Sequence, residues 1–186
     1  ASLVVAASPA MVALVARAPL FLAVHPKVPA NTFKEFLDYV KSQPGKVNYG
    51  SSGIGSTHHL TVEAMKTSLG LNMVHVPFKG TGQSVPALVG GQVEMLFSAY
   101  PSLAGFVKDN RVRILASNAA QRSPQAPDVP TIAETIPGFD FAVIIGILAP
   151  TGTPPAILQK ISNEVVAVTQ MADARNAFAA GGIGSV

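Results

Sequence analysis

A segment rich in glycine and serine, residues 48–59, lies between a short apolar run and a helical pattern. It supplies three glycines and four short hydroxyl side chains: Gly50, Gly53, Gly55, Ser51, Ser52, Ser56 and Thr57. The glycines permit a tight turn, and a hydroxyl group directly before a helix can cap its first N–H groups. Those N–H groups have no internal acceptor, and the helix dipole attracts anions to them. The segment therefore predicts a strand-to-helix turn of an α/β protein that binds a carboxylate or phosphate.

Three familiar glycine loops do not match this segment. Gly50 and Gly55 have the spacing of a nucleotide-binding P-loop, but Ser56 stands where that loop needs its lysine. The dinucleotide-binding fingerprint lacks its third glycine, because His58 occupies that position. No register gives the Gly-x-Ser-x-Gly sequence of a hydrolase nucleophile. An ordinary strand-to-helix turn with a serine cap and no ligand is the alternative to an anion site.

Short apolar runs alternate with helical patterns along the rest of the chain. Strands are predicted at residues 2–7, 12–16, 19–24, 47–49, 73–77, 93–97, 111–116 and 139–149. Helices or helical turns are predicted at residues 32–43, 57–69, 85–89, 101–108, 131–136, 153–168 and 172–180. This alternation is typical of an α/β protein with mainly parallel sheets.

Signals at helix ends support three of these helices. Thr32 and Glu35 form a capping box at the first of them. Gly70 ends the helix at residues 57–69. Its inward face is formed by one of two sets, Leu60, Ala64 and Thr67 or else Met65 and Leu69. Thr153 caps the helix that Pro154 begins. One face of that helix is apolar: Ile157, Leu158, Ile161, Val165 and Val168.

A second glycine-containing loop, residues 78–82, follows the predicted strand at residues 73–77. Because the carboxyl ends of neighbouring parallel strands meet at one edge of a sheet, this loop is expected beside residues 48–59. Lys79 in this loop either adds a positive charge to the anion site or is simply solvated. Ser98 ends another predicted strand, where it either donates a hydrogen bond to the ligand or caps the helix beginning at Pro101.

Composition excludes several classes of function. With 48% hydrophobic and 12% charged residues among 186, the chain can build one domain or two small lobes with ample core. The net charge is +3, but lysine and arginine form no cluster, so a nucleic-acid site is not expected. The absence of cysteine excludes disulfides, thiolate metal sites and cysteine catalysis. Pro9, Arg17 and Pro19 interrupt the apolar residues 1–24, which two buried strands explain better than a membrane span.

The four histidines do not predict a metal site. His58 and His59 are consecutive, so on a helix their side chains point about 100° apart and cannot readily share an ion. His25 and His75 are isolated in the sequence. Surface or supporting roles are the simplest interpretation of all four.

A small hydrolytic enzyme stays open as an alternative. Ser52 with a histidine and either Asp128 or Asp140 would be the residues to test. No local signature links these residues, so catalysis is not the expected function.

Four parts of the chain, in this order and spacing, resemble one protein family. They are Asn-Tyr-Gly-Ser-Ser-Gly-Ile-Gly-Ser-Thr-His-His at residues 48–59, His-Val-Pro-Phe-Lys-Gly at 75–80 with Gly-Gly-Gln-Val at 90–93, Arg-Ser-Pro at 122–124 with Pro-Asp-Val-Pro-Thr at 127–131, and Leu-Ala-Pro-Thr-Gly-Thr-Pro at 148–154. They resemble the substrate receptors of tripartite tricarboxylate transporters, the Bug-type periplasmic solute-binding proteins. The likeness covers nearly the whole chain from Ala13.

The resemblance implies an α/β fold of the type II periplasmic binding protein kind, with two lobes, mainly parallel sheets and a ligand cleft between the lobes. Lobe 1 is expected from residues 1–25 and 142–186, and lobe 2 from residues 26–141. Such a receptor closes on a small carboxylated solute and presents it to integral-membrane transporter components. It is expected in the periplasm as a monomer, without nucleic acid, cofactor or metal ion, and without catalytic activity.

Eight residues are the ligand contacts that the motifs and the resemblance together predict: Ser8, Ser51, Gly55, Ser56, Thr57, Lys79, Gly80 and Ser98. Ser8 is included because it follows a strand of lobe 1. Many relatives carry aspartate where this chain has Ser98, a position suited to a ligand ammonium group. The resemblance therefore favours a plain mono- or dicarboxylate over an amino acid. A receptor that serves a sensor rather than a transporter would share the cleft and is the alternative.

Members of this family are considerably longer than this sequence. They have an opening strand and a proline-glycine loop, which supply half of the ligand cradle, before the position of Ala1. They also have a helix and loop between the positions of Ala10 and Met11, and a strand and helix after Val186. Lobe 1 is therefore expected to be incomplete in this sequence.

Overall fold

Five of the short apolar runs join into one sheet between residues 19 and 143. The computed structural model describes residues 10–181 and 183–185. The chain divides into two units: unit 1 comprises Ala1–Ala18 and Ile144–Val186, and unit 2 comprises Pro19–Val143. The strand expected at residues 2–7 and the ligand contact expected at Ser8 lie outside the described residues.

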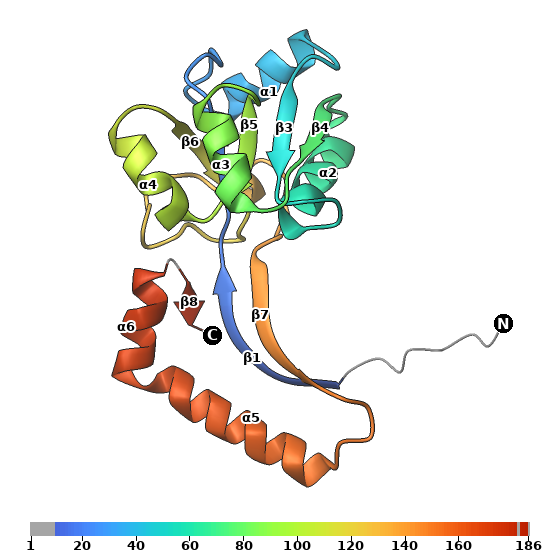
Figure 1. Ribbon diagram of the computed structural model, residues 1–186, viewed down its shortest axis with the longest axis vertical. Coiled ribbons are helices and arrows are strands. Elements are labelled where there is room, and N and C mark those ends of the chain that lie inside the picture. Colours follow the sequence, from blue (N-terminus) through green and yellow to red (C-terminus); the bar gives the residue numbers. More distant parts are fainter. Residues whose placement is uncertain (1–9, 182, 186) are drawn as a thin grey trace, which may run out of the picture. The chain divides into compact units, whose positions relative to one another are not determined.

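The sheet of unit 2 has the strand order β4-β3-β5-β2-β6 (Figure 1). Its strands are β2 (Phe21–Val24), β3 (Asn48–Ser51), β4 (Val74–Pro77), β5 (Met95–Ser98) and β6 (Arg113–Ser117). Strand β3 runs parallel to β4 and β5, whereas β2 is antiparallel to β5 and β6. The predicted α/β class is confirmed, and the antiparallel β2 makes the sheet a mixed one.

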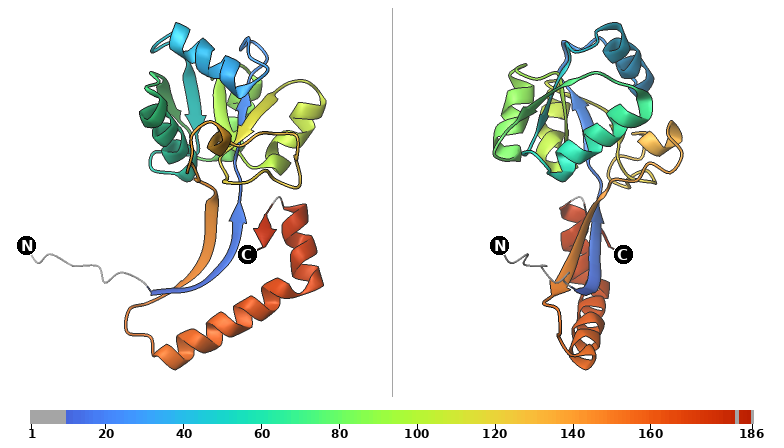
Figure 2. Two further views of the ribbon diagram at one scale, coloured as in Figure 1. Left: turned by 180° about the vertical axis from the view of Figure 1, so that it is seen from behind. Right: turned by 90° about the vertical axis from the view of Figure 1, so that its right-hand side faces the viewer.

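Helices cover both faces of this sheet. They are α1 (Phe33–Ser42), α2 (Thr57–Leu69), α3 (Thr81–Val89) and α4 (Tyr100–Lys108). The right-hand view of Figure 2 shows α1 and α2 on one side and α3 and α4 on the other. Phe36 and Met65 are buried in the core of the first side, and Leu88 and Leu103 in the core of the second. Because side chains along a strand alternate between the two faces, β2, β5 and β6 contribute to both cores.

Helix α2 begins and ends where the sequence predicts. Ser56 is its N-cap, and Gly70 ends it in the left-handed conformation, φ 63°, that glycine adopts at little cost. Helix α1 likewise starts after Thr32, whose side chain accepts a hydrogen bond from the Glu35 N–H at 3.1 Å. The local signals at these helix ends are therefore sufficient to place them.

The inward face of α2 is the one that contains Met65 and Leu69. Met65 is fully buried, and Leu69 packs against the same core. Leu60 is 51% exposed, so the alternative face built on Leu60 is wrong. The helix instead turns Thr61 inward, where its hydroxyl lies 3.4 Å from the Asn118 side-chain amide.

Strand β2 lies in unit 2, although it was expected in lobe 1. It is hydrogen-bonded between β5 and β6, so the chain passes from unit 1 to unit 2 at Ala18 and Pro19 rather than at His25 and Pro26. Pro19 has no N–H group and cannot continue a strand ladder in the sheet interior. It therefore separates β2 from β1 (Ala10–Ala18).

The long strand expected at residues 139–149 is only partly formed. Strand β7 spans Val143–Ala149, and residues 139–142 are irregular. The Phe141 N–H donates to the Asn118 backbone carbonyl at 2.9 Å, and the Phe141 carbonyl accepts from the Asn118 side-chain amide at 2.6 Å. The backbone at Phe141 is therefore hydrogen-bonded to one asparagine instead of a neighbouring strand.

Asn118 also fixes the other segment that leads out of unit 2. Its backbone N–H donates to the Leu20 carbonyl at 2.9 Å, and its side-chain oxygen accepts from the Leu20 N–H at 2.7 Å. Asn118 is fully buried, where an unpaired amide would be costly. One residue thus holds the backbone beside both points at which the chain passes between the units.

Unit 1 contains strands and helices that pack with few buried side chains. Its elements are β1, β7, β8 (Gly184–Ser185), α5 (Pro155–Gln170) and α6 (Ala172–Ala180), with the strand order β7-β1-β8. Strands β1 and β8 are antiparallel, and α5 packs against β1. The buried side chains of its described residues are Ala13, Ala16, Ala149 and Thr169.

Helix α5 differs from its prediction at its start and on its face. It begins at Pro155 with Pro154, not Thr153, at the N-cap, and the Thr153 hydroxyl donates to the Pro150 carbonyl at 2.8 Å. Apolar side chains expected on one packed face, such as Ile157 and Val168, are exposed. The bounds predicted for α6 are confirmed. Of the helices in the described part of the chain, none combines the length and apolarity needed to cross a bilayer.

Candidate functional site

The two glycine-containing loops lie side by side, as predicted, at the edge of the unit 2 sheet where β3 and β4 end. Ser51 and Pro77 pair at the ends of these parallel strands, and the Phe78 N–H donates to the Ser51 carbonyl at 3.1 Å. Helices α2 and α3 begin from these loops at the same edge (Figure 1). Strand β5 runs parallel to β3 and ends there with Ser98. We call this the carboxyl edge, residues 51–56 the first loop and residues 78–80 the second loop.

The first loop is closed by its own hydrogen bonds. The Ser51 hydroxyl accepts from the Gly53 N–H at 3.1 Å, and the Ser56 hydroxyl donates to the Gly53 carbonyl at 2.7 Å. Gly53 and Gly55 have φ angles of 130° and 78°, which residues with a Cβ rarely adopt. The shape of the loop therefore depends on glycine at these two positions.

Two consecutive histidines of α2 contact different residues of the first loop, both through Nδ1. The Ser52 hydroxyl lies 2.8 Å from His58 Nδ1. The Gly55 N–H donates to His59 Nδ1 at 3.2 Å, so this nitrogen acts as an acceptor and carries no proton. Burial lowers the pKa of His58, which favours its uncharged form at neutral pH.

His75 of β4 contacts the first loop at Ser51. Its Nε2 lies 2.7 Å from the Ser51 hydroxyl. Its ring stacks on His59 with centroids 4.1 Å apart and on Tyr49 with centroids 4.8 Å apart. Burial lowers the pKa of His75 as well, which favours its uncharged form at neutral pH.

A hydrogen-bond network lies next to this stack. The Tyr49 hydroxyl donates to the Glu63 carboxylate, which pairs with the Lys66 ammonium group at 2.6 Å. Burial raises the pKa of Tyr49, and the hydrogen bond to Glu63 adds to that shift. Burial alone would raise the pKa of Glu63, but hydrogen bonds from Lys66 and Tyr49 outweigh it and lower the pKa. Glu63 is therefore ionised at neutral pH, with Lys66 as its counter-ion.

Four backbone N–H groups at the carboxyl edge have no hydrogen-bond acceptor among the described residues. They belong to the first two residues of α2 and of α3: Thr57, His58, Thr81 and Gly82. The start of a helix is also the positive end of its dipole. The edge thus presents two neighbouring sets of donors suited to an anion.

Five of the expected ligand contacts lie in the two loops or at the start of α2: Gly55, Ser56, Thr57, Lys79 and Gly80. Ser51 is only 1% exposed, and its hydroxyl is engaged by Gly53 and His75. Ser98 is fully buried, and its hydroxyl has no partner within the described residues. Ser98 does not cap α4, whose N-cap is Ala99, so that alternative is wrong.

The sequence did not single out the histidines that support the first loop. His59 follows the N-cap Ser56 by three positions, which is the spacing of a capping box, but that motif has glutamate or glutamine there. This spacing is the signal that could have found His59. The contact between Ser51 and His75, 24 residues apart, depends on the pairing of β3 with β4 and has no local signature.

The form of the hydrolase alternative that uses Asp128 is not assembled at the first loop. Ser52 and His58 are in contact, but Asp128 lines a pocket elsewhere in unit 2 with Tyr100 and Arg113. Burial accounts for the lowered pKa of His58, with no carboxylate among its causes. Within residues 10–181 and 183–185, no group of three or more His, Cys, Asp or Glu side chains is placed to hold a metal ion.

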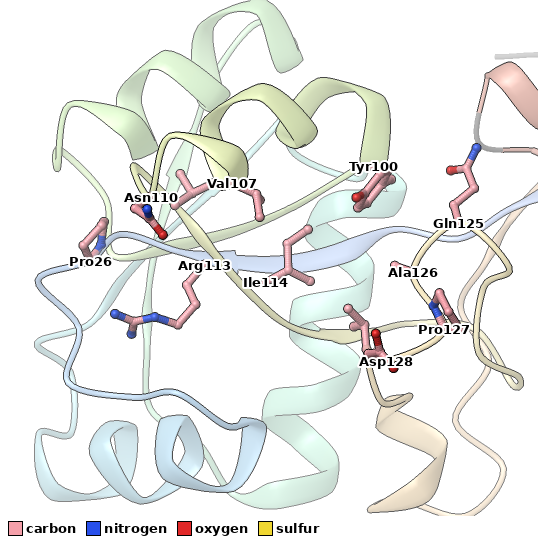
Figure 3. A pocket seen from close by; sticks show the side chains of 12 residues that line it. Pro26, Tyr100, Val107, Asn110, Arg113, Ile114, Gln125, Ala126, Pro127 and Asp128 are labelled. Atoms are coloured by element: carbon pink, nitrogen blue, oxygen red, sulfur yellow. The ribbon is translucent and has the colours of Figure 1, made fainter.

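That pocket has a volume of about 430 Å³ and lies between α4, β6 and the loop at residues 125–129 (Figure 3). Much of its lining is apolar: Val107, Val112, Ile114, Ala126 and Val129. The Arg113 guanidinium donates to the Val28 carbonyl at 3.4 Å and to the Ala30 carbonyl. The pocket contains none of the expected ligand contacts, and backbone carbonyls already engage its arginine.

Known proteins match both the sequence and the fold. The family model for the tripartite tricarboxylate transporter family receptor matches residues 7–186. A Cupriavidus necator protein, "UPF0065 protein in gbd 5'region", is 36% identical over 151 residues, which are 81% of this chain and 46% of that protein. The structure "R. palustris Rpa4515 with adipate" has a TM-score of 0.83 at 29% identity and covers 97% of this chain and 60% of its own.

A second structure, MatC (Rpa3494) from Rhodopseudomonas palustris with bound malate, has a TM-score of 0.80 at 30% identity and covers 95% of this chain and 60% of its own. The chain thus spans about half the length of the curated relatives it matches. The periplasmic binding protein fold expected from the sequence is confirmed.

Proposed function

The chain belongs to the receptor family of the tripartite tricarboxylate transporters, and we propose that it binds a small mono- or dicarboxylate at the carboxyl edge of unit 2. Two similar structures hold adipate and malate, which are both dicarboxylates. The observation that carries the proposal is the pair of neighbouring helix starts with unengaged N–H groups. These groups match the acceptor oxygens of a carboxylate.

In the proposed complex, a carboxylate exchanges its water for donors that the fold already holds in place. The N–H groups of Thr57 and His58 bind from the start of α2, and those of Thr81 and Gly82 from the start of α3. Fixed N–H dipoles can hold an anion without an arginine. Lys79, exposed in the second loop, adds positive charge to the same edge.

The loops that follow β3, β4 and β5 at this edge contain no acidic residue, which supports a ligand without an ammonium group. Asp and Glu occur at none of the positions between Asp38 and Glu63, between Glu63 and Glu94, or between Glu94 and Asp109. The loops that follow β3, β4 and β5 all lie within these intervals. An amino acid would need a counter-charge for its ammonium group. We therefore propose a plain mono- or dicarboxylate.

We propose further that the protein acts in the periplasm as a monomer and delivers its ligand to integral-membrane transporter components. The family is one of receptors rather than enzymes, which supports binding without turnover. No cofactor or metal ion has a role in this proposal. The carboxylate would leave the protein chemically unchanged.

Calorimetric titration with malate and adipate tests the proposal. Gly55→Val combined with Ser56→Ala should weaken binding at least tenfold, or by about 1.4 kcal/mol. Valine is strained at the φ of 78° found at Gly55, and α2 loses its cap. Thr32→Ala, which removes the corresponding cap of α1, is the control and should leave affinity unchanged. Unchanged affinity in the double variant would refute the loop assignment, and consumption of the carboxylate would refute a receptor.

A further inference from the structure

Two helical segments of unit 2 begin with a threonine that is paired with a glutamate three residues later. In α1, the Thr32 hydroxyl accepts from the Glu35 N–H at 3.1 Å, and the Glu35 carboxylate accepts from the Asn31 N–H at 2.7 Å. In the 3₁₀ helix η1 (Ile132–Glu134), the Glu134 carboxylate accepts from the Thr131 N–H at 3.0 Å. Each pair satisfies N–H groups that a helix start leaves without an acceptor.

Helix α2 repeats the arrangement of α1 with histidine in place of glutamate. The Ser56 hydroxyl accepts from the His59 N–H at 3.3 Å, and His59 Nδ1 accepts from the Gly55 N–H at 3.2 Å. In both helices, the side chain of the third helical residue accepts a hydrogen bond from the backbone N–H of the residue before the N-cap. The difference is electrical: Glu35 provides a carboxylate, whereas His59 accepts through the lone pair of an unprotonated nitrogen.

The helices that follow β3, β4 and β5 share the lack of negative charge at their starts. The first turns of α2, α3 and α4 contain no acidic residue, whereas the first turn of α1 contains Glu35. Helix α1 follows β2, which is antiparallel to β5, so it connects strands at the edge of the sheet opposite the carboxyl edge. An acidic residue in the first turn normally stabilises a helix. Its absence at the carboxyl edge therefore leaves the positive ends of these helix dipoles uncompensated.

We infer that His59 is a neutral helix cap that determines the specificity of the carboxyl edge for anions, an inference that rests on the proposed function. His59 holds the first loop through Gly55 but places no negative charge beside the N–H groups of Thr57 and His58. A glutamate at this position would make the same hydrogen bond and repel a carboxylate ligand. His59 is thus a positioning residue whose neutrality matters as much as its hydrogen bond.

The charged groups around His59 already compensate one another. Glu63, one turn further along α2, lies 4.0 Å from His59 Nε2 and pairs with Lys66 at 2.6 Å. Tyr49 of β3 donates to Glu63, and His75 of β4 stacks on the His59 ring. The His59 side chain is 18% exposed, so salt would screen a charge placed there less than a fully solvated charge.

Two variants of nearly equal shape, His59→Gln and His59→Glu, separate the charge from the hydrogen bond. His59→Gln should restore a neutral cap and bind malate within about threefold of the native affinity. His59→Glu should bind malate at least tenfold more weakly than His59→Gln, which corresponds to about 1.4 kcal/mol. Without ligand, their melting temperatures should lie within about 3 °C of each other, since both can cap α2. The difference in affinity should shrink as the salt concentration rises.

Glu35→Gln is the matched control, because it makes the same change of charge in the cap of α1 and should leave malate affinity unchanged. Nitrogen NMR of the native protein provides a test that needs no variant. His59 Nδ1 should be unprotonated at neutral pH, and a protonated Nδ1 would overturn the inference.

Equal malate affinities of folded His59→Gln and His59→Glu would also overturn it. An equal loss of malate affinity in the two variants, relative to the native protein, would assign the effect to the imidazole ring and not to its neutrality. Failure of the native protein to bind any mono- or dicarboxylate would instead overturn the proposed function.

Discussion

Units 1 and 2 differ in where they place their large apolar side chains. Unit 2 buries them on both faces of its sheet, with Leu22, Phe36 and Met65 fully enclosed. In unit 1, side chains of the same kind on β7 and α5 are exposed: Ile144, Ile147, Leu148, Ile157 and Val168. Burial of a large apolar side chain stabilises a fold by about 1.5–3 kcal/mol. Unit 2 therefore supplies its own stabilising core, and the carboxyl edge is built entirely on it.

The largest expected effect comes from separating the units. A fragment of residues 19–143 should fold alone, because both sheet faces and the Asn118 contacts lie within it. A peptide of residues 144–186 should show no cooperative unfolding, because so few of its side chains are buried. Urea unfolding followed by circular dichroism measures both. A gradual, non-cooperative unfolding transition of the 19–143 fragment would contradict the claim that unit 2 supplies its own stabilising core.

A matched pair of leucine substitutions tests the same contrast in the whole chain. Leu22 is fully buried in β2, and Leu148 of β7 is 55% exposed. Leu22→Ala should lower the free energy of unfolding by about 2–5 kcal/mol. Leu148→Ala should lower it by less than about 1 kcal/mol, because most of that side chain already contacts water. If denaturant titrations gave equal losses of unfolding free energy for the two variants, the exposure of apolar side chains would not distinguish the stability of the two units.

Replacing Asn118 should have a smaller effect that remains specific to unit 2. Asn118→Ala removes the side-chain hydrogen bonds to Leu20 and Phe141 and leaves their buried backbone groups without that partner. The expected loss is about 1–3 kcal/mol of unfolding free energy. Asn163→Ala on exposed α5 is the control and should change stability by no more than about 0.5 kcal/mol. Chemical denaturation of both variants would show whether the losses differ.

The smallest effect is expected from an exposed ion pair of unit 2. The hydrogen bond from Arg122 is the main reason that the pKa of Glu134 falls to about 2. Glu134 is therefore ionised in the folded state where an unfolded glutamate, with a pKa of about 4.3, takes up a proton. Its stabilising contribution is present above about pH 4.3 and is lost as the pH falls towards 2.

Glu134→Gln should accordingly flatten the decline of melting temperature below pH 5, by a small amount because the pair is exposed. Glu164→Gln on α5 should leave the decline unchanged, since Glu164 forms no ion pair with any described residue. Parallel pH profiles for native protein and Glu134→Gln would argue against a contribution from this pair.

Local signals predicted much of unit 2 and less of unit 1. Helix α2 has its cap at Ser56 and its stop at Gly70, and both act over a few residues. The same reasoning failed for α5, whose N-cap position is occupied by Pro154 and not by Thr153. A hydroxyl residue near a helix start therefore caps the helix only where it occupies the N-cap position itself.

Sequence patterns did not predict the pairing of segments that are far apart in the chain. Strand β2 could not be assigned to unit 2 until its pairing with β5 and β6 was seen. The contacts of Asn118 with Leu20 and Phe141 span 98 and 23 residues and leave no local signature. The first position at which the chain passes between the units was misplaced for this reason.

The candidate site was predicted as two converging loops but not in its internal contacts. Glycine and hydroxyl residues before α2 identified the first loop, and strand alternation placed the second beside it. Ser51 and Ser98 were expected to face the ligand, yet both are buried at strand ends. They are buried because helices cover both faces of the sheet, so nearly every residue of β3 and β5 is enclosed. The supporting role of His59 required the observed hydrogen bond to Gly55.

The central claim is that a carboxylate binds between the starts of α2 and α3. Backbone amide NMR of the whole chain during a malate titration tests it most directly. The amide signals of Thr57, His58, Thr81 and Gly82 should shift together with one binding curve, because these N–H groups gain an acceptor. Shifts confined to the pocket residues Asn110 and Asp128, with the helix-start amides unchanged at saturation, would contradict the account.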